Sequence, residues 1–488
     1  MKRASGQSKV KNTKKKDFFG VGSDASETGG PMDRSIDPLL TDHEGDITHT
    51  SLEQRTVERA VLNLTRTYRL HPEYRFSIKL NAEKHIKYLL KGLDQLSNSY
   101  ASLDASRPWL CYWIVNSLNL LHALPENVAP RLVDFLGRCQ ARSGGFAGGP
   151  GQLPHLAPTY ATICALMTVG TKEAYDLVDR QAMLRFLREM KLSDGGFQMH
   201  VDGESDVRGT YCAIVVASVL NILTPDLIQG TAEYIKRCQT YEGGIGGCPG
   251  NEAHGGYAYC GVSALSILNL LHTIDLNALL QWVIERQMRL EGGFQGRTNK
   301  LVDSCYSFWQ AAIFPQVEAA LGVGDVQQRI SSSSSSSGQT DKQIEEGSKI
   351  EEINSDEEEE AIKAKMGSGM LEIMKKAEQY VQSEKENVGG WLFDQRALQD
   401  YILLCAQEEK SAGGLRDKPG KSRDYYHTCY SLNGLSIAQH NPSYYTYSST
   451  VVGSDPSNLL NEIHPSYGVA KAQVEQALAY FAQLPSLA

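Results

Sequence analysis

The pattern of apolar and polar positions repeats along most of this 488-residue chain. Short amphipathic helical patterns alternate with longer stretches that are apolar on nearly every side, such as ATICALMTV and AIVVASVLNIL. A Gly-Gly pair separates each short pattern from the longer stretch that follows it. The pairs occur at 144–145, 195–196, 243–244, 292–293 and 413–414. The first three spacings are 51, 48 and 49 residues, which indicates a structural repeat of about 50 residues.

Each repeat is predicted to form a helix, a Gly-Gly turn, a polar loop and a second helix. A single hairpin of this kind cannot bury its own apolar face, so the repeats must stack on one another. No stretch favours β-strands. We therefore expect an all-α protein, an α/α toroid of about six helical hairpins in which outer helices surround inner ones. The centre of such a ring is either plugged or hollow, and we expect an open central funnel.

Further helices are predicted at both ends of the repeats. Leu52 to Leu70 and Asn81 to Gln95 have helical patterns, and Pro108 suits the first turn of another helix. The segment Lys471 to Leu484 also has a helical period, and we expect it to close the ring against the first repeats.

Two segments fall outside the repeat pattern. The fourth spacing between Gly-Gly pairs is 121 residues and contains seven consecutive serines, followed by ten acidic residues against two lysines at 341–360. We interpret 325–387 as a low-complexity loop insertion, an inert linker or a regulatory segment, in one catalytic domain formed by 51–324 and 388–488. Seven of the first 16 residues are Lys or Arg, so 1–50 is predicted to be a disordered basic tail, which is either solubilising or in weak contact with an acidic surface.

Composition and charge narrow the function classes. The net charge of −9 gives no reason to expect nucleic-acid binding. No apolar segment follows the N-terminal charges, and most of the ten cysteines lie in apolar helical patterns, so we expect a cytoplasmic protein with free thiols. The uncharged stretch from Gly255 to Ile274 is long enough to span a membrane, but its polar residues and its match to the repeat favour a core helix. We therefore expect no transmembrane segment.

Candidate chemistry gathers at one position of the repeat. The tenth residue after the second glycine is titratable in all five repeats: His155, Asp206, His254, Asp303 and Asp424. Equivalent positions of a toroid lie on one rim, at the N-termini of the inner helices, where free N–H groups suit an anionic ligand. These residues are either helix caps or functional groups. Histidine is a poor cap, so His155 and His254 favour the functional interpretation.

Asp303, Cys305 and His427 are candidates for a metal site. Asp303 and Cys305 could both face one ion only in the turn before a helix, and His427 lies at a similar phase of the next repeat. One oxygen, one sulfur and one nitrogen ligand suit Zn²⁺, and three protein ligands leave an open position, as in catalytic zinc sites. On spacing alone, an unrelated grouping of the three residues stays open.

Two further groups of residues are predicted beside this site. Arg297, Lys300, His254 and Tyr306 would form a cationic, hydrogen-bonding cluster that stabilises charge on a diphosphate leaving group. For Lys300 alone, a solvated loop is an equal alternative. Aromatic residues at the start of the inner helices either belong to the core or line a funnel for a long apolar ligand. These are Trp109, Trp113, Tyr160, Tyr211, Tyr257 and Trp309.

Five motifs carry a resemblance to a known family. They are PHLAPTY, DVRGTYCA, EAHGGY, EGGFQGRTNKLVDSCYSFWQ and GLRDKPGKSRDYYHTCY. Together they strongly resemble the β subunits of protein farnesyltransferases, and the match extends from about Arg107 to Pro465, interrupted by the insertion.

The resemblance implies roles for individual residues. Asp303, Cys305 and His427 are similar to the family's zinc ligands, and Asp417 to the residue linked to magnesium. The residues that hold the farnesyl diphosphate head group are matched by His254, Arg297, Lys300 and Tyr306. The lining of the isoprenoid pocket is matched by Trp109, Arg208, Tyr211, Tyr257, Cys260 and Trp309. Positions around the C-terminal tripeptide of the acceptor are matched by Ser106, Trp113, His155, Ala157 and Tyr426.

The resemblance also implies a reaction and its partners. Such a chain is the catalytic β subunit of a heterodimer whose α subunit contributes a lysine to the diphosphate site. It transfers farnesyl from farnesyl diphosphate to the Cys thiol of C-terminal Cys-a-a-X proteins, with one Zn²⁺ per β subunit and Mg²⁺ with the diphosphate. On this basis the chain alone would be inactive.

The β subunit of type I protein geranylgeranyltransferase is the alternative within the family. Trp109, Tyr430 and Asp417 favour farnesyl. The longer-chain relative resembles this sequence with a small residue in place of Trp109, and it lacks a carboxylate at Asp417. More distant alternatives are a terpene-cyclase-like toroid and a non-catalytic binding toroid. The first needs a buried acidic cluster, which the sequence lacks outside the insertion, and the second predicts no metal.

Overall fold

The computed structural model describes residues 47–321, 392–407, 412–440 and 451–487. These residues belong to one compact unit, His43–Ala488, and the preceding unit, Met1–Asp42, lies outside the described residues. The predicted insertion at 325–387 also lies outside them, as does the predicted basic tail except for 47–50. The boundaries of both segments therefore stay predictions.

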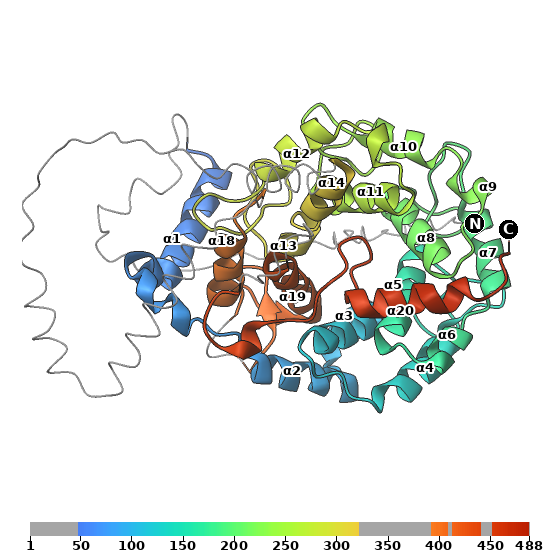
Figure 1. Ribbon diagram of the computed structural model, residues 1–488, viewed down its shortest axis with the longest axis horizontal. Coiled ribbons are helices and arrows are strands. Elements are labelled where there is room, and N and C mark those ends of the chain that lie inside the picture. Colours follow the sequence, from blue (N-terminus) through green and yellow to red (C-terminus); the bar gives the residue numbers. More distant parts are fainter. Residues whose placement is uncertain (1–46, 322–391, 408–411, 441–450, 488) are drawn as a thin grey trace, which may run out of the picture. The chain divides into compact units, whose positions relative to one another are not determined.

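Inner helices form a closed ring, in which each helix packs on the next and the last packs on the first (Figure 1). The inner helices are α3 (Arg107–Leu120), α5 (Leu156–Val169), α8 (Val207–Val219), α11 (Gly255–Ile267), α13 (Tyr306–Trp309) and α19 (Tyr425–Gln439). They are buried on nearly all sides, which explains why their sequences are apolar all round. The inner stretch after the fourth Gly-Gly pair was predicted as one helix, but it divides into α13 and α14 (Ile313–Leu321).

Shorter amphipathic helices surround the ring, one ahead of each Gly-Gly pair and one ahead of α3. The outer helices are α2 (Ala82–Asp94), α4 (Val128–Cys139), α7 (Arg180–Met190), α10 (Thr231–Cys238), α12 (Leu276–Ile284) and α18 (Gln395–Asp400), the last continuing as the π-helical turn η5 (Tyr401–Ala406). The six pairs of outer and inner helices confirm the predicted all-α toroid of helical hairpins.

The Gly-Gly turns hold successive hairpins together. The first glycine of each pair has a positive φ, between 81° and 103°. A Cβ built on Gly243 would lie 2.1 Å from the carbonyl oxygen of Ala278 in the next outer helix, and one on Gly413 would lie 1.8 Å from that of Lys84 in α2. Only glycine permits this approach. The fifth turn thus returns to the first outer helix and closes the outer ring.

The remaining elements lie at the edges of the toroid. They are α1 (His49–Leu70), η2 (Pro72–Ser77), η3 (Asn98–Ser106), α6 (Lys172–Asp176), α9 (Pro225–Ile228), η4 (Leu271–Thr273), η6 (Pro456–Asn458), α20 (Lys471–Ala482) and a two-stranded antiparallel ribbon of β1 (Leu415–Arg416) and β2 (Arg423–Asp424). The predicted helices at 52–70 and 81–95 are confirmed as α1 and α2. The described ranges contain no helix that is long and apolar enough to cross a membrane. All ten cysteines are free.

Helix α20 was expected to close the ring, and this prediction is wrong in part. It packs on α5 and α8, the inner helices of the first two Gly-Gly repeats, but the contact between α19 and α3 closes the ring. The reason is the width of the apolar face. Helix α20 buries only Val474, Ala477 and Phe481, so it can cover the ring from one side but cannot replace an inner helix.

The segment between Ile463 and Ala470 fills one end of the ring. It projects among the inner helices ahead of α20 (Figure 1), and its backbone carbonyls accept hydrogen bonds from inner-helix tyrosines. The ring is therefore plugged at this end. At the opposite rim, Trp109, Tyr257 and Trp309 are partly exposed and Arg208 is exposed.

Four partly or fully buried histidines act as hydrogen-bond acceptors in the fold. In each, Nδ1 accepts a backbone N–H: His85 from Gly414, His155 from Ala157, His254 from Gly256 and His464 from Ser466, at 2.9 to 3.2 Å. Burial lowers the pKa of each of these histidines to about 4. They are neutral at pH 7, and protonation would remove the acceptor.

We expect acid to destabilise the fold through these side chains. In the unfolded chain a histidine titrates near pH 6.5, whereas in the folded chain these four titrate near 4. Between those values only the unfolded state takes up the proton, so the free energy of unfolding falls as pH is lowered. His464→Asn keeps a side-chain acceptor without titrating, and should reduce this pH slope by about 1 kcal/mol per pH unit. Urea unfolding at pH 7, 6 and 5 measures it, and parallel curves for the variant and the wild type would contradict it.

Candidate metal centre and donor site

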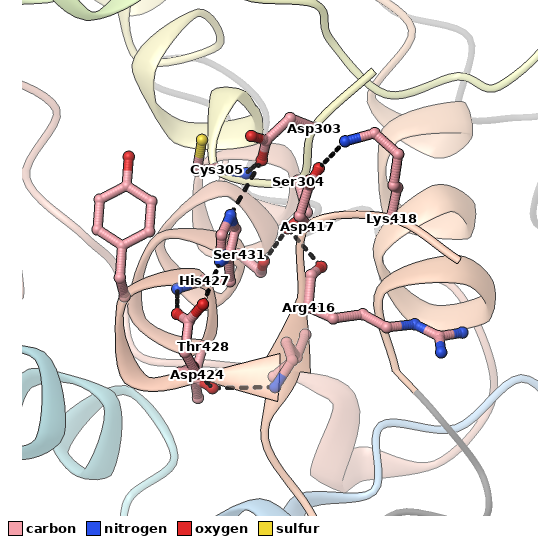
Figure 2. Close-up of polar contacts among 12 residues, drawn as sticks. Asp303, Ser304, Cys305, Arg416, Asp417, Lys418, Asp424, His427, Thr428 and Ser431 are labelled. Carbon is pink, nitrogen blue, oxygen red and sulfur yellow. Dashed lines mark hydrogen bonds and ion pairs between the residues drawn. The ribbon is translucent and has the colours of Figure 1, made fainter. Parts of the chain in front are cut away.

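Asp303, Cys305 and His427 lie together at the rim of the ring (Figure 2). One ligand atom from each side chain lies within 4.8 Å of the others. Asp303 and Cys305 come from the turn that precedes α13, and His427 comes from the first turn of α19. His427 Nε2 lies 3.4 Å from Asp303 Oδ1. Among the described residues this is the one group of three or more His, Cys, Asp or Glu side chains that could hold a metal ion.

Backbone hydrogen bonds fix the turn that carries Asp303 and Cys305. Asp303 Oδ1 accepts the N–H of Cys305 at 2.9 Å, which orients the carboxylate toward the start of the helix. Ser304 donates its N–H to the carbonyl of Asp417 at 2.8 Å and its hydroxyl to the carbonyl of Arg416 at 2.8 Å. The turn is therefore attached to the ribbon that precedes α19, the helix that bears His427.

Asp424 orients His427, a role that the sequence analysis missed. Its Oδ1 accepts the backbone N–H of His427 at 2.7 Å and caps α19. Its Oδ2 lies 2.7 Å from His427 Nδ1, so Nδ1 carries a proton and Nε2 faces Asp303 (Figure 2). A carboxylate on the outer nitrogen is the usual partner of a metal-binding histidine. The position of Asp424 in the repeat was noted in the sequence, but only as a helix cap or rim residue.

The electrostatics of the cluster favour a positive charge at its centre. Burial opposes the charged form of His427, but hydrogen bonds with Asp303, Asp424 and Cys305 outweigh it and raise the pKa of His427 well above its usual value. Burial would also raise the pKa of Asp303, yet the hydrogen bond and charge of His427 hold it well below its usual range. Burial and the charge of Asp303 raise the pKa of the Cys305 thiol. A proton on His427 thus supplies the positive charge, and the oxygen, nitrogen and sulfur donors are compatible with zinc.

A buried ion pair lies next to this cluster. Lys418 Nζ is paired with Asp417 Oδ1 (Figure 2). The carbonyl of Asp417 accepts a hydrogen bond from the hydroxyl of Tyr401 at 3.0 Å. Burial and the nearby charge of Asp303 raise the pKa of Asp417 to about 6. Asp417 was predicted from the sequence and Lys418 was not, although Lys418 is its neighbour in the motif RDKPGK.

The predicted cationic cluster is only partly cationic. The Nε2 of His254 lies 3.0 Å from the hydroxyl of Tyr306, and its Nδ1 accepts a backbone N–H, so Nε2 carries the hydrogen. The low pKa of His254 makes it a neutral donor, so the cations of the predicted cluster are Arg297 and Lys300. Arg297 is ion-paired with Glu252, a residue not predicted for the site. Lys300 is exposed and donates its backbone N–H to Gln295.

The expectation that histidine makes a poor cap is also wrong here. His155 is the N-cap of α5 and His254 is the N-cap of α11, because the ring Nδ1 reaches the N–H two residues ahead. Asp206 makes the equivalent bond to Arg208. Capping and function are therefore not alternatives at this position, since the cap uses only Nδ1 of each ring and the Nε2 of His254 contacts Tyr306.

Aromatic side chains extend from the metal cluster across the rim. Trp309 donates its Nε1–H to the hydroxyl of Tyr426 at 3.1 Å, and Tyr426 lies edge-on to Trp113 with ring centroids 5.5 Å apart. Trp113 in turn lies 5.7 Å from Trp109. The structure thus places the two predicted peptide-binding aromatics between the two predicted isoprenoid-binding tryptophans.

The other predicted residues lie around and below these aromatics. Arg208 stacks over Tyr257 at 5.6 Å and is paired with Asp206. Tyr211 and Cys260 are buried deeper in the ring. Ala157 donates its N–H to His155, whose ring lies 5.4 Å from that of His200. Ser106 immediately precedes α3 and makes no side-chain capping bond.

Comparisons with known proteins agree with this fold and show the family of the chain. The family profile described as prenyltransferase alpha-alpha toroid domain matches residues 80–469. The protein farnesyltransferase subunit beta of Arabidopsis thaliana is 42% identical over 421 residues, which cover 83% of this chain and 84% of the relative. That of Pisum sativum is 44% identical over 394 residues, covering 78% of this chain and 90% of the relative.

A solved structure is similar in fold. The Candida albicans protein geranylgeranyltransferase-I complexed with GGPP matches with a TM-score of 0.58 and 18% identity, covering 83% of this chain and 100% of that one. This likeness supports the toroid alone. The family match and the identities above one third over most of the chain carry the assignment. The chain is therefore a prenyltransferase that belongs to the protein farnesyltransferase β-subunit family.

Proposed function

We propose that this chain is the catalytic β subunit of a heterodimeric, zinc-dependent protein farnesyltransferase. It would transfer farnesyl from farnesyl diphosphate to the Cys thiol of C-terminal Cys-a-a-X proteins in the cytoplasm. The observation that carries the proposal is the Asp303, Cys305 and His427 cluster, which lies at the edge of an aromatic rim. The proposal also includes an α subunit as the partner of this chain. It keeps the predicted basic tail at 1–50 and the predicted acidic insertion at 325–387 as segments outside the catalytic domain.

In this proposal Asp303, Cys305 and His427 hold Zn²⁺. Zinc, when bound, lowers the pKa of a coordinating thiol, so that an acceptor cysteine is a nucleophilic thiolate at neutral pH. The chain's own residues keep this site rigid. Asp424 sets the ring of His427, and Ser304 fixes the turn between the other two ligands. Preorganised ligands of this kind lose little freedom when the substrate binds.

The diphosphate would bind beside the cluster. His254 presents Nε2–H, Tyr306 presents a hydroxyl, and Arg297 and Lys300 supply positive charge. Donors fixed before the reaction stabilise charge that grows on the leaving diphosphate. Asp417 would hold Mg²⁺ together with the diphosphate, because Mg²⁺ is usually bound by one or two carboxylates and substrate phosphates. A lysine of the α subunit would complete the site.

The isoprenoid would lie against Trp109, Arg208, Tyr211, Tyr257, Cys260 and Trp309. The acceptor tripeptide would contact Ser106, Trp113, His155, Ala157 and Tyr426. Trp109 supports fifteen carbons rather than twenty, because its indole packs on Tyr160 and Tyr112 at 5.6 and 6.2 Å and so takes up the depth of the ring. The type I geranylgeranyltransferase β subunit is the alternative, and donor length separates the two.

Metal analysis tests the proposal directly. The chain co-expressed with a prenyltransferase α subunit should contain about one tightly bound zinc and should transfer farnesyl. Cys305→Ala should lose both zinc and turnover but keep most of its affinity for farnesyl diphosphate, because the thiol is a metal ligand only. Cys238→Ala, a buried thiol in the outer helix α10, is the control and should keep both. Absence of zinc from the active complex would refute the proposed metal site.

Asp424→Asn should weaken zinc binding by about 10- to 100-fold, since the amide cannot hold His427 Nδ1–H as a carboxylate does. The measurement is zinc retained during titration with a competing chelator. Asp206→Asn is a matched control, because Asp206 caps α8 at the same position of its repeat and contacts no residue of the cluster. Equal zinc affinity in the two variants would contradict the role given to Asp424.

Trp109→Thr should allow the twenty-carbon donor. Replacing the indole by a small side chain opens depth in the ring, so we expect the ratio of kcat/KM for geranylgeranyl diphosphate over farnesyl diphosphate to rise by at least about tenfold. Side-by-side transfer assays with both diphosphates measure the ratio. Unchanged donor preference would count against Trp109 as the residue that limits length.

A further inference from the structure

A layer of tyrosines closes the ring below the rim tryptophans. Four successive inner helices, α3, α5, α8 and α11, each contribute one tyrosine that is at most 3% exposed. They are Tyr112, Tyr160, Tyr211 and Tyr259. The hydroxyl oxygen of Tyr211 lies 3.2 Å from those of both Tyr160 and Tyr259. The four side chains therefore form one connected layer across the ring.

Three of these hydroxyls hold the segment that plugs the ring. Tyr112 donates to the carbonyl of Gly468, Tyr160 to that of Tyr467 at 3.1 Å, and Tyr211 to that of Ser466 at 2.9 Å. Three consecutive carbonyls, 466 to 468, are thus each bound by a different inner helix. We name residues 466–468 the plug.

Two further bonds fix the plug from other sides. The hydroxyl of Ser466 donates to Gln316 Oε1 at 2.9 Å, and the hydroxyls of Tyr467 and Ser218 lie 2.9 Å apart. Gly468 has a φ of 70°, and a Cβ there would lie 3.1 Å from the hydroxyl of Tyr112. The plug therefore has one tightly defined position.

The tyrosine layer lies directly beneath the two rim tryptophans that would contact the donor, and it includes Tyr211, which is itself predicted to line the isoprenoid pocket. Trp109 packs on Tyr160 at 5.6 Å, and Trp309 packs on Tyr259 at 5.0 Å. Both tryptophans are partly exposed at the rim, whereas the tyrosines are closed off on all sides. An apolar chain that enters between the tryptophans must stop at this layer.

We propose that the plug is a positioning element that sets the depth available to the isoprenoid and hence the preferred donor length. The inference rests on the proposed prenyl transfer. The plug acts through Tyr112, Tyr160 and Tyr211, whose hydroxyls can hold their rings in place only while the three carbonyls stay where they are. Removing a hydroxyl leaves a buried carbonyl without its donor, which is costly, and the plug then relaxes toward solvent. The floor of the pocket would move while the volume of its side chains stays almost unchanged.

The experiment uses single Tyr112→Phe and Tyr211→Phe variants of the full chain, purified with the α subunit. We expect faster amide hydrogen exchange in residues 463–470, and a fall of at least about fivefold in the preference for farnesyl over geranylgeranyl diphosphate, measured as the ratio of kcat/KM values. Ser218→Ala is a milder variant that removes only the bond to Tyr467, and should change both readouts in the same direction. Tyr175→Phe is the matched control, because its buried hydroxyl lies under α20 and touches neither the plug nor the tyrosine layer.

The outcomes separate the inference from the proposed function. Faster exchange with an unchanged donor ratio would overturn the inference, because the plug would then move without affecting donor length. An unchanged exchange rate in all three variants would overturn it as well. If the two kcat/KM values fall by the same factor, so that the donor ratio equals that of the Tyr175→Phe control, the hydroxyls have a structural role only and the inference is overturned. A wild-type complex that transfers neither diphosphate would refute the proposed function itself, and the inference with it.

Discussion

The close approach between each Gly-Gly turn and the next outer helix is the constraint on which the site depends. In all five turns a Cβ on the first glycine would lie 2.6 Å or less from a carbonyl oxygen, so the backbones meet without side chains between them. Because one contact recurs at every step, each hairpin is rotated from its neighbour in the same way, and the fifth contact returns to α2. The starts of all inner helices therefore lie on one rim. That rotation brings Asp303 and Cys305 of one repeat to His427 of the next.

The repeat and its phase could be predicted from the sequence, and the rest could not, for identifiable reasons. Gly-Gly pairs and apolar stretches are local signals, so the toroid followed from them. The repeat phase made Asp303, Cys305 and His427 a candidate group, and the resemblance to the family favoured it. The place of α20 could not be derived, because a helix with three buried positions could cover several surfaces. Lys418 and Glu252 were not predicted, because each matters only through its ion pair, Lys418 with Asp417 and Glu252 with Arg297. Ion pairs depend on distances in space, which cannot be read from the spacing of residues in the sequence. Roles in binding and catalysis stay predictions.

The rim shows that one side chain can serve the helix and the site together. Asp424 caps α19 and also holds His427, and His254 caps α11 with one nitrogen while the other faces Tyr306. Because one side chain makes both contacts, a rotation that broke its contact with His427 or Tyr306 would also break the helix cap. The functional side chains therefore have little freedom to rotate. The two capping histidines, His155 and His254, are neutral because burial lowers the pKa of each to about 4. A neutral imidazole keeps the acceptor nitrogen that the helix cap requires.

The two ends of the ring differ in the kind of polar contact they contain, and the difference suits an amphiphilic ligand. The rim includes contacts between charged groups, Asp303 with His427, Lys418 with Asp417 and Arg297 with Glu252. At the plug the contacts are between neutral groups, and each of the three carbonyls accepts a hydrogen bond from one tyrosine hydroxyl. A charged side chain at the plug would lie against the apolar part of such a ligand. Burying it there would cost far more free energy than burying a hydrogen-bonded hydroxyl. Tyrosine is suited to that layer, because its ring presents apolar surface while its hydroxyl is hydrogen-bonded, to the plug in Tyr112, Tyr160 and Tyr211 and to Tyr211 in Tyr259. The polarity of the ring thus falls from rim to plug along the same direction in which an isoprenoid diphosphate changes from charged to apolar.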